Sequence, residues 1–572
     1  MSKGKKSPYH VVQNQIVSLM LMAGFLLAAT GLAQADFVFG PPENLGPVIN
    51  GPLHDAGGTV SADGLSMLIA RYVSWNTAPE LLVAQRATLE DPWQDPVSYG
   101  AWADPPSMIR TLVDVMNGIL AGSGPADELE VYFSGVLPNG YGSQDIWTME
   151  RGAIGAAWSP AVNLGPVVNT SYEEMGPALS PDGLELYFSG YSRDGARPGG
   201  FGAADLWVTT RPTREAAWGP PMNLGPAINS PAQDARVSLS TDGLVLLFDS
   251  ARAEGYGSGD LYMMTRRMLA DPWSPPMNLG PAINTSAFEE SPAFSPDGST
   301  LYWDSARPGG YGGHDLWQAR LITIVDLNGD GRVGGEELLT MTESWGQDNS
   351  LCDIGPMPWG DGTVDIQDVV ALAEYIGKDV DDPTLVGHWT LDETEGTVAS
   401  DSAGENDGTV MGSPVWHPDA GMVDGALEFD GVGTFVVSDL AVKSADGPFS
   451  ILAWVKGGQP GQVLISQQGG GDWLSINPAD GTLATECAGR VNRPLFSEGV
   501  ITDGKWHRIG ITWDGTSRRL YMDSEEVATD SQDSLASSDG GLMFGAGKHL
   551  AAGSFFSGLI DDVRIYDRIV KP

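Results

Sequence analysis

The sequence is poor in positive charge. Of its 572 residues, 31 are lysine or arginine and 74 are aspartate or glutamate, so the net charge is −43. Beyond Lys6 no lysine occurs before Lys378. A chain this acidic is repelled by phosphate backbones and by anionic membrane surfaces. General nucleic-acid binding is therefore excluded as a function.

Cysteine is also scarce, with two residues in the whole chain. Cys352 and Cys487 belong to different predicted modules, so we expect no disulfide scaffold. The seven histidines are scattered without metal-ligand spacing. The sequence shows no nucleophile triad, phosphate-binding loop or zinc motif, so no enzyme class marked by such motifs is indicated.

Long apolar runs are absent except near the N-terminus. Lys3, Lys5 and Lys6 precede the apolar stretch 16–33, and Ala-Gln-Ala at 33–35 is a small-x-small cleavage pattern. Residues 1–35 are therefore predicted to be a secretory signal peptide. The alternative is an uncleaved anchor, since about 18 apolar residues can just span a bilayer. We expect an exported protein (extracellular, at the cell surface or periplasmic) with no membrane span after cleavage.

Residues 37–320 repeat a pattern. Asn-Leu-Gly-Pro begins at Asn44, Asn163, Asn223 and Asn278. The fullest unit continues with the turn Ser-Pro-Asp-Gly at 180–183, a β-rich run from Leu184, and a glycine-rich loop before Asp-Leu-Trp at 205–207. These segments make three strands, and the stretch leading to Asn-Leu-Gly makes a fourth. Four-stranded units repeating every 55 to 60 residues or so are typical of propeller blades.

Counting strands gives a five-bladed β-propeller over residues 36–322. Middle strands are predicted near Ser66, Leu129, Glu185, Val245 and Thr300, and outer strands from Phe39, Trp93, Trp158, Trp218 and Trp273. The first outer strand precedes every inner strand, and the last blade has none after Arg320. We therefore expect residues 37–46 to complete the last blade and to pair its open edge.

The repeats resemble the TolB-like and WD-like repeats of exported propellers. The resemblance is carried by Ser-Pro-Asp-Gly at 295–298, Ala-Arg-Pro-Gly-Gly-Tyr-Gly at 306–312 and Asp-Leu-Trp at 315–317. It covers about half of the chain. It implies an architecture and no particular activity, because propellers serve many functions.

Acidic residues recur just before the innermost strands. They are Asp55, Glu173, Glu174, Asp234, Glu289 and Glu290. Because they arise from repetition, a structural role is the first interpretation; a carboxylate ring for a cation or sugar is the second. Catalysis needs carboxyl groups with different environments, and its weak candidates are Glu174, Glu290 and Asp234. Arg197, Arg252 and Arg307 recur as well and are expected to pair with acids of their own or neighbouring blades.

A calcium-loop motif follows the repeats at 326–337. Asp326, Asn328 and Asp330 occupy positions 1, 3 and 5, glycine makes the turn at position 6, the carbonyl of Arg332 serves position 7, and Glu337 closes the loop. A second loop, less regular, offers Asp361, Thr363, Asp365 and Asp368. Asp353 completes it if Gly-Pro-Met-Pro at 355–358 bulges out. The predicted cofactor is calcium.

The two loops, each followed by one helix, resemble a dockerin over residues 324–378, within a predicted module at 323–379. Dockerins attach exported proteins to cohesin receptors, so the resemblance implies a cohesin-like partner. The chain departs from the pattern where Glu337 replaces the usual aspartate and where positions 10 and 11 carry Gly-Glu at 335–336 and Ile-Gln at 366–367. The alternative is a stabilising spacer.

Residues 385–572 show strand alternation, for example at 507–513 before the Asp-Gly turn at 514–515. They are predicted to form a β-sandwich of jelly-roll type. The stretches 387–393, 427–431, 449–455, 505–508 and 558–566 resemble the concanavalin-like laminin-G family, whose members often bind carbohydrate or protein and hold calcium. Asp430 and Asp561 are weak metal candidates. The alternative for Asp561, an acid among aliphatic residues, is a basic or backbone partner.

The fold is thus predicted to be mainly β, with a propeller and a sandwich joined by a small helical, EF-hand-like module. We expect a secreted calcium-binding protein, more a binding protein than an enzyme, that takes carbohydrate or a cell-surface protein as its partner. One alternative is a propeller-type glycoside hydrolase of polysaccharide degradation, attached through the dockerin-like module. Another is a structural envelope protein.

Overall fold

The computed structural model describes residues 37–61, 63–74, 80–89, 91–98, 129–151, 159–191, 197–347, 349, 351–445, 447–487 and 493–572. The chain is mainly β and falls into two compact units. The propeller unit holds Met1–Thr323 and Gly346–Asp368; the sandwich unit holds Ile324–Trp345 and Val369–Pro572. The residues predicted as one calcium module therefore divide between the two units. The predicted signal peptide lies outside the described residues.

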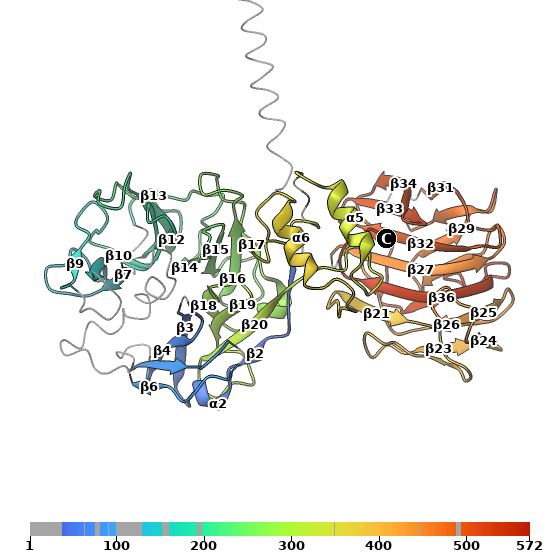
Figure 1. Ribbon diagram of the computed structural model, residues 1–572, viewed down its shortest axis with the longest axis horizontal. Helices are drawn as coiled ribbons and strands as arrows, with labels where there is room; N and C mark the ends of the chain where they lie inside the picture. Colours follow the sequence, from blue (N-terminus) through green and yellow to red (C-terminus); the bar gives the residue numbers. More distant parts are fainter. Residues whose placement is uncertain are drawn as a thin grey trace, which may run out of the picture. The chain divides into compact units, whose positions relative to one another are not determined.

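The first unit is a five-bladed propeller of antiparallel sheets (Figure 1). The sheets are β3 (His54–Val60), β4 (Ser66–Tyr72), β5 (Glu80–Gln85) and β6 (Val97–Ser98); β7 (Leu129–Gly135), β8 (Asp145–Arg151) and β9 (Val162–Asn163); β10 (Glu173–Leu179), β11 (Glu185–Tyr191), β12 (Ala204–Thr210) and β13 (Met222–Asn223); β14 (Asp234–Leu239), β15 (Val245–Ser250), β16 (Asp260–Thr265) and β17 (Met277–Asn278); and β18 (Glu289–Phe294), β19 (Thr300–Ser305) and β20 (Asp315–Thr323).

The N-terminal segment completes the last blade. β1 (Phe37–Phe39) and β2 (Glu43–Asn44) both pair with β20, Val38 opposite Ile322 and Asn44 opposite Trp317. This is the arrangement that the strand count predicts. Apart from β1, the outer strands are only two residues long. The strand expected from Trp218 begins at Met222, and Trp158 lies outside the described residues.

The repeated motifs fasten each blade. In the third blade, the Asp205 carboxylate accepts backbone N–H bonds from Phe201 and Gly202 of the glycine-rich loop. It also accepts the amide N–H of Asn223, from the Asn-Leu-Gly-Pro motif. The same bonds recur at Asp145, Asp260 and Asp315. The repeated aspartate thus ties the loop to the outer strand, which gives the motif a structural explanation.

The described inner strands of four blades lie around the propeller axis. β10 contacts β14, β14 contacts β18, and β18 contacts β3, so strands from the two ends of the repeat region lie side by side (Figure 1). Each of these strands starts beside a loop residue of another blade, as in the parallel bridges of His54 with His314 and of Gln144 with Glu173. These bridges place the loop residue before each Asp-Leu-Trp motif close to the propeller axis.

The second unit is a β-sandwich of two eight-stranded sheets. One holds β21 (Leu385–Trp389), β24 (Val415–His417), β25 (Ala426–Asp430), β27 (Phe449–Gly457), β32 (Trp506–Trp513), β33 (Ser517–Met522), β34 (Glu525–Ser531) and β36 (Ser557–Tyr566). The other holds β22 (Val398–Ala399), β23 (Gly408–Met411), β26 (Phe435–Val437), β28 (Val463–Gln467), β29 (Asp472–Ile476), β30 (Thr482–Thr485), β31 (Leu495–Val500) and β35 (Leu542–Phe544). Trp473 and Trp513 belong to the core between the sheets.

Helices are few. The described residues form α2 (Gly46–Ile49), α4 (Gly280–Ile283), α5 (Gly335–Glu343) and α6 (Ile366–Ala373). α5 and α6 follow the two predicted calcium loops, and the division between the units runs through α6. Among the described residues, no helix combines the length and apolar character needed to cross a membrane.

Candidate functional site

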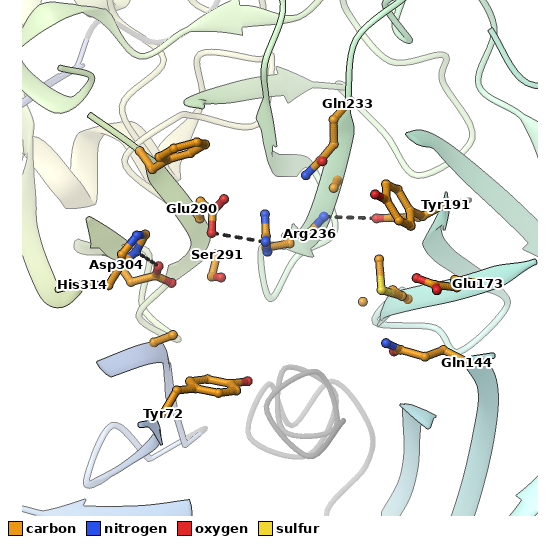
Figure 2. A pocket seen from close by; sticks show the side chains of 16 residues that line it. Tyr72, Gln144, Glu173, Tyr191, Gln233, Arg236, Glu290, Ser291, Asp304 and His314 are labelled. Atoms are coloured by element: carbon orange, nitrogen blue, oxygen red, sulfur yellow. Dashed lines mark hydrogen bonds and ion pairs between the residues drawn. The ribbon is translucent and has the colours of Figure 1, made fainter. Parts of the chain in front are cut away.

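A cavity of about 520 Å³ opens at the centre of the propeller (Figure 2). The inner strands β3, β10, β14 and β18 supply much of its wall, and the bridged loop residues supply the rest. The lining comprises Ala56, Tyr72, Gln144, Glu173, Met175, Gly176, Ser189, Tyr191, Gln233, Ala235, Arg236, Phe288, Glu290, Ser291, Asp304 and His314. Its volume lies within the 300–1,000 Å³ that small-molecule sites typically occupy.

A β-bulge interrupts the four described inner strands β3, β10, β14 and β18 at the same position of the repeat. The bulged positions are Gly57, Gly176, Arg236 and Ser291, with φ angles of 92°, 58°, 52° and 54°. Glycine adopts this left-handed conformation at no steric cost, whereas arginine and serine do so at a cost in free energy. Such strained residues cluster at functional sites. Here the bulge brings Arg236 and Ser291 to the cavity wall.

Arg236 is the centre of a charged cluster. Its guanidinium Nη1 lies 3.0 Å from Oδ2 of Asp249. Its Nη2 lies 3.2 Å from Oε2 of Glu290 (Figure 2). Asp249 comes from β15 and is buried, and its Oδ1 has no hydrogen-bond partner among the described residues. Burial raises the pKa of Asp249 to about 7, although the charge of Arg236 opposes this shift. The cluster beside the cavity therefore holds carboxyl groups in different environments.

A histidine–aspartate pair lies beside this cluster. Nδ1 of His314 is 3.1 Å from Oδ2 of Asp304, and both residues are buried. Burial acts to lower the pKa of His314, but the hydrogen bond and charge of Asp304 outweigh it and raise that pKa. Glu290, Asp304 and His314 each offer a ligand atom, and these atoms lie within 4.8 Å of one another.

The opposite wall carries neutral hydrogen-bonding groups and one acid. Gln144, Glu173 and Tyr191 face this side, and Tyr72 lies apart from both groups (Figure 2). Glu173 accepts a hydrogen bond from the hydroxyl of Ser143. The cavity is thus asymmetric, with most of its charged groups on the fourth and fifth blades and Glu173 alone on the third.

The recurrent acids of the sequence divide into two sets. Asp55, Glu174, Asp234 and Glu289 are buried and pair with Arg71, Arg197, Arg252 and Arg307, respectively. The three repeated arginines therefore pair within their own blades, as expected. Two of the weak catalytic candidates, Glu174 and Asp234, belong to these structural pairs and do not line the cavity. The third, Glu290, lines it together with Glu173.

The sequence analysis missed Arg236, Asp249, Asp304 and His314. In the sequence, two of these residues, Asp249 and Asp304, are marked by a difference between the blades at one position of the repeat. Where the third blade has Phe-Ser-Gly at 188–190, the fourth has Phe-Asp-Ser at 248–250 and the fifth Trp-Asp-Ser at 303–305. These residues occur in only one or two blades, so a pattern shared by all the repeats does not reveal them.

The first acidic loop is ordered around Asp326 in the sandwich unit. Asp326 Oδ1 accepts the backbone N–H groups of Gly329 and Asp330, and Oδ2 accepts that of Gly331. Glu337 is buried; its Oε2 accepts the N–H of Gly334, while Oε1 has no partner among the described residues. Burial raises the pKa values of Asp326 and Glu337. Clustered carboxylates with an unpartnered buried oxygen fit a hard cation.

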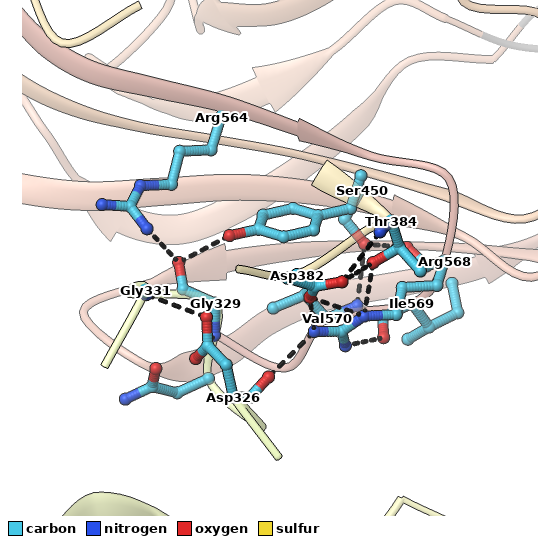
Figure 3. Close-up of polar contacts among 12 residues, drawn as sticks. Asp326, Gly329, Gly331, Asp382, Thr384, Ser450, Arg564, Arg568, Ile569 and Val570 are labelled. Atoms are coloured by element: carbon cyan, nitrogen blue, oxygen red, sulfur yellow. Dashed lines mark hydrogen bonds and ion pairs between the residues drawn. The ribbon is translucent and has the colours of Figure 1, made fainter. Parts of the chain in front are cut away.

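Basic residues of the sandwich hold this loop (Figure 3). The carbonyl of Gly329 accepts hydrogen bonds from Arg508 at 2.9 Å and from the Tyr566 hydroxyl at 3.1 Å. Arg568 donates to the carbonyl of Asp326 at 2.8 Å. Asn328, Asp330 and Arg332 complete the loop, with Asp330 Oδ1 accepting the backbone N–H of Arg332. The loop is therefore fixed to its own unit by side chains from β32 and the end of the chain.

The second acidic loop repeats this pattern in the propeller unit. Asp353 Oδ1 and Oδ2 accept the N–H groups of Asp361 and Gly362, which matches the role of Asp326. Asp368 Oδ2 accepts the N–H of Asp365, and Asp361 Oδ1 that of Thr363. Burial raises the pKa of Asp353 to about 6. The structure thus gives Asp353 the first position, with four extra residues in the loop.

The extra residues have a packing role. Trp359 is buried in the propeller core, its ring 5.0 Å from that of Phe294, and its indole N–H bonds Oδ2 of Asp242. Arg267 donates to the carbonyl of Gly362. This explains why Met357 and Trp359 stand where a regular loop would carry ligands.

The two sandwich candidates belong to different local clusters. Asp430 Oδ1 accepts three N–H groups of its own turn, from Val432, Gly433 and Thr434, and these bonds lower its pKa to about 2. Asp561 is buried, and its Oδ2 accepts the N–H groups at positions 422 and 423. No contact among the described residues joins them, so they remain separate candidates.

Comparisons with known proteins identify part of the chain. Residues 430–572 match the concanavalin A-like lectin/glucanases superfamily, so this part is a concanavalin-like domain. No curated protein matches the chain. Among solved structures, a Trypanosoma rangeli sialidase with the inhibitor DANA is 13% identical over 91% of this chain and 92% of its own, with a TM-score of 0.36. Domain 4 of the Geobacillus stearothermophilus GH43 arabinanase AbnA, with arabinotriose, is 19% identical over 33% of this chain and 94% of its own, with a TM-score of 0.26.

Proposed function

We propose that this protein binds carbohydrate in the axial cavity of its propeller. The observation that carries the proposal is the differentiated polar lining of that cavity, which the repeat alone does not produce. Sugar hydroxyls both donate and accept hydrogen bonds. The cavity offers a guanidinium donor in Arg236, carboxylate acceptors in Glu290 and Glu173, and two glutamine amides. Tyr72, Tyr191 and Phe288 add aromatic surface to the cavity. The match of residues 430–572 to a superfamily of lectins and glucanases concerns the sandwich unit and not this cavity.

Binding to a panel of polysaccharides and glycoproteins, with and without chelator, tests this proposal. We expect Arg236→Gln to weaken binding, because the guanidinium is the strongest donor in the cavity. Arg214→Gln is the matched control, since Arg214 donates to carbonyls at 181 and 182, outside the cavity lining. A wild-type protein that binds no member of the panel contradicts the proposal.

One observation favours the glycoside hydrolase alternative. Asp249 has a raised pKa beside Glu290, and carboxyl oxygens of Glu290 and Asp304 lie within 4.8 Å. Glycosidases use two carboxyl groups in different environments, roughly 5–5.5 Å apart in retaining enzymes. In that case Glu290→Gln abolishes product release from a polysaccharide, whereas the exposed Glu254→Gln does not. If the protein binds polysaccharides but releases products from none of them, the glycoside hydrolase alternative is contradicted and the binding function remains.

We also propose that the chain is exported and that calcium occupies both acidic loops. Each loop is held by its own unit, through Arg508 and Arg568 in one case and Trp359 in the other. Because these contacts fix each loop to its own unit, they favour a stabilising role for the loops. They give less support to a role in attachment to a cohesin-like receptor. Binding of a cohesin domain to the intact, calcium-loaded chain would reverse that preference.

A further inference from the structure

We propose that Glu290, Asp304 and His314 form a binding site for a divalent transition-metal ion, such as zinc or manganese, in the wall of the axial cavity. The three residues come from β18, β19 and the loop before β20, all in the fifth blade. Their ligand atoms lie within 4.8 Å of one another, and all three line the cavity (Figure 2). This inference stands apart from carbohydrate binding and from the calcium loops.

Asp304 supplies an independent observation. Its side chain is 1% exposed, and its Oδ1 has no hydrogen-bond partner among the described residues. A buried carboxylate oxygen without a donor is costly and needs an explanation. Its other oxygen lies 3.1 Å from Nδ1 of His314. An ion held about 2.0–2.2 Å from each ligand brings those ligands to roughly this separation.

The charge of the site also calls for a cation. Asp249, Glu290 and Asp304 are three carboxyl groups within one cluster, and Arg236 is the cation paired with two of them. Arg236 engages Oε2 of Glu290, so that the second oxygen of this carboxyl group serves as the metal ligand. A divalent ion at Glu290, Asp304 and His314 neutralises the remaining negative charge.

The donor set selects the metal. Calcium takes six to eight oxygen ligands, as both acidic loops can provide. Imidazole nitrogen with two carboxylates instead suits zinc, manganese or related ions. Three protein ligands at the wall of an open cavity leave further positions for water or for oxygens of a ligand, which is the arrangement of metal sites with an open coordination position.

Cobalt(II) binding to the full chain tests the site. The metal-stripped protein is first saturated with calcium, and cobalt is then titrated while its visible d–d absorption is followed. We expect one equivalent of cobalt, displaced by zinc. Asp304→Asn and His314→Gln should weaken binding by more than the 10–100-fold typical for loss of an outer-shell partner. Glu290 is the least buried of the three ligands. Glu290→Gln therefore still tests the site if the other two variants fail to fold.

Glu173→Gln is the matched control, because Glu173 lines the same cavity on the opposite wall (Figure 2). It should keep full cobalt binding, and circular dichroism should show all variants folded. Cobalt that binds equally to the three ligand variants, or that fails to bind the wild-type chain, overturns the proposal. Carbohydrate binding is measured separately on the metal-free protein, so failure of one proposal is distinguishable from failure of the other.

Discussion

At the scale of single residues, the chain buries several acids without a cation beside them. Asp561 is the clearest case: it is fully buried, and its Oδ1 has no partner among the described residues. Burial raises its pKa to about 7, against two backbone N–H bonds that favour the charged form. The folded chain therefore takes up a proton here at a pH where the unfolded chain, with an ordinary aspartate, has lost it.

Asp561→Asn should flatten part of the dependence of stability on pH. Because the folded pKa lies above the unfolded value, stability falls as pH rises from about 4 to about 7. One pKa unit corresponds to about 1.4 kcal/mol, so the ionised form costs the folded state a few kcal/mol. Thermal unfolding at pH 5 and pH 8 should show a smaller loss for the variant than for the wild type.

The control for this prediction is Asp430, whose pKa is shifted in the opposite direction to that of Asp561. Asp430 has a lowered pKa, so Asp430→Asn removes a favourable charge at both pH values and leaves the difference between them unchanged. If Asp561 instead holds a cation, Asp561→Asn lowers the melting temperature at pH 8 in calcium, which contradicts the interpretation of an unpaired acid.

At the scale of elements, the blades were predictable because each one contains the local sequence motifs that specify its own turns and strands. The middle strands begin where the sequence predicts, at Ser66, Glu185, Val245 and Thr300. The turn and loop motifs that mark them are local hydrogen-bonding devices, such as Asp182 accepting the N–H of Leu184. The outer strands are shorter than predicted. A single backbone bond, such as that of Gly219 to Thr210, joins the chain to the neighbouring strand beside the tryptophan, and the regular strand begins only at Met222.

Removal of residues 37–45 should destabilise the propeller. Without β1 and β2 the outer edge of β20 loses its partners, and an unpaired edge promotes aggregation. Compared with a chain that begins at Asp36, we expect a lower melting temperature and concentration-dependent aggregation. A synthetic peptide of residues 37–46 should restore the melting temperature. Equal stability of the two chains would contradict closure through this segment.

Arg568→Met tests the contacts around the first acidic loop. Arg568 Nη2 lies 2.6 Å from Oδ2 of Asp382, and both side chains are at most 10% exposed. Breaking a buried ion pair leaves an uncompensated charge and costs about 3–5 kcal/mol. The variant also loses the bond to the Asp326 carbonyl, so calcium affinity should fall along with the melting temperature of the sandwich unit.

The control for Arg568 is an exposed ion pair in the same unit. Arg519 pairs with Asp514, and both are more than a quarter exposed, so Arg519→Met should cost about 0–1 kcal/mol. The double variant Arg568→Met, Asp382→Leu should recover much of the lost stability. An Arg568→Met chain as stable as the wild type shows that the loop does not depend on this contact.

At the scale of the whole molecule, the sequence predicts the architecture better than the site. Propeller and sandwich follow from repeated or alternating patterns that local physics explains. The charged wall of the cavity depends on Arg236, Asp304 and His314, with Asp249 buried behind Arg236, and these residues come together only when neighbouring blades pack side by side. The division of the acidic loops between two units has the same origin, since Trp359 and Arg568 act through distant partners.

This division leads to a prediction about calcium. Asp326 and Glu337 belong to the sandwich unit, whereas Asp353 and Asp368 belong to the propeller unit. In calorimetry we expect chelation to lower the melting temperature of both units, since a ligand at 100 times its Kd contributes about 2.7 kcal/mol. Asp326→Asn should remove the calcium effect from the sandwich transition alone, and Asp353→Asn from the propeller transition alone, with the exposed Asp381→Asn as control.

The effect of calcium on both melting temperatures should be smaller at pH 5 than at pH 8, because the raised carboxyl pKa values make protons compete with the ion. Calcium that stabilises neither transition, or both transitions in each single variant, contradicts two separate loops.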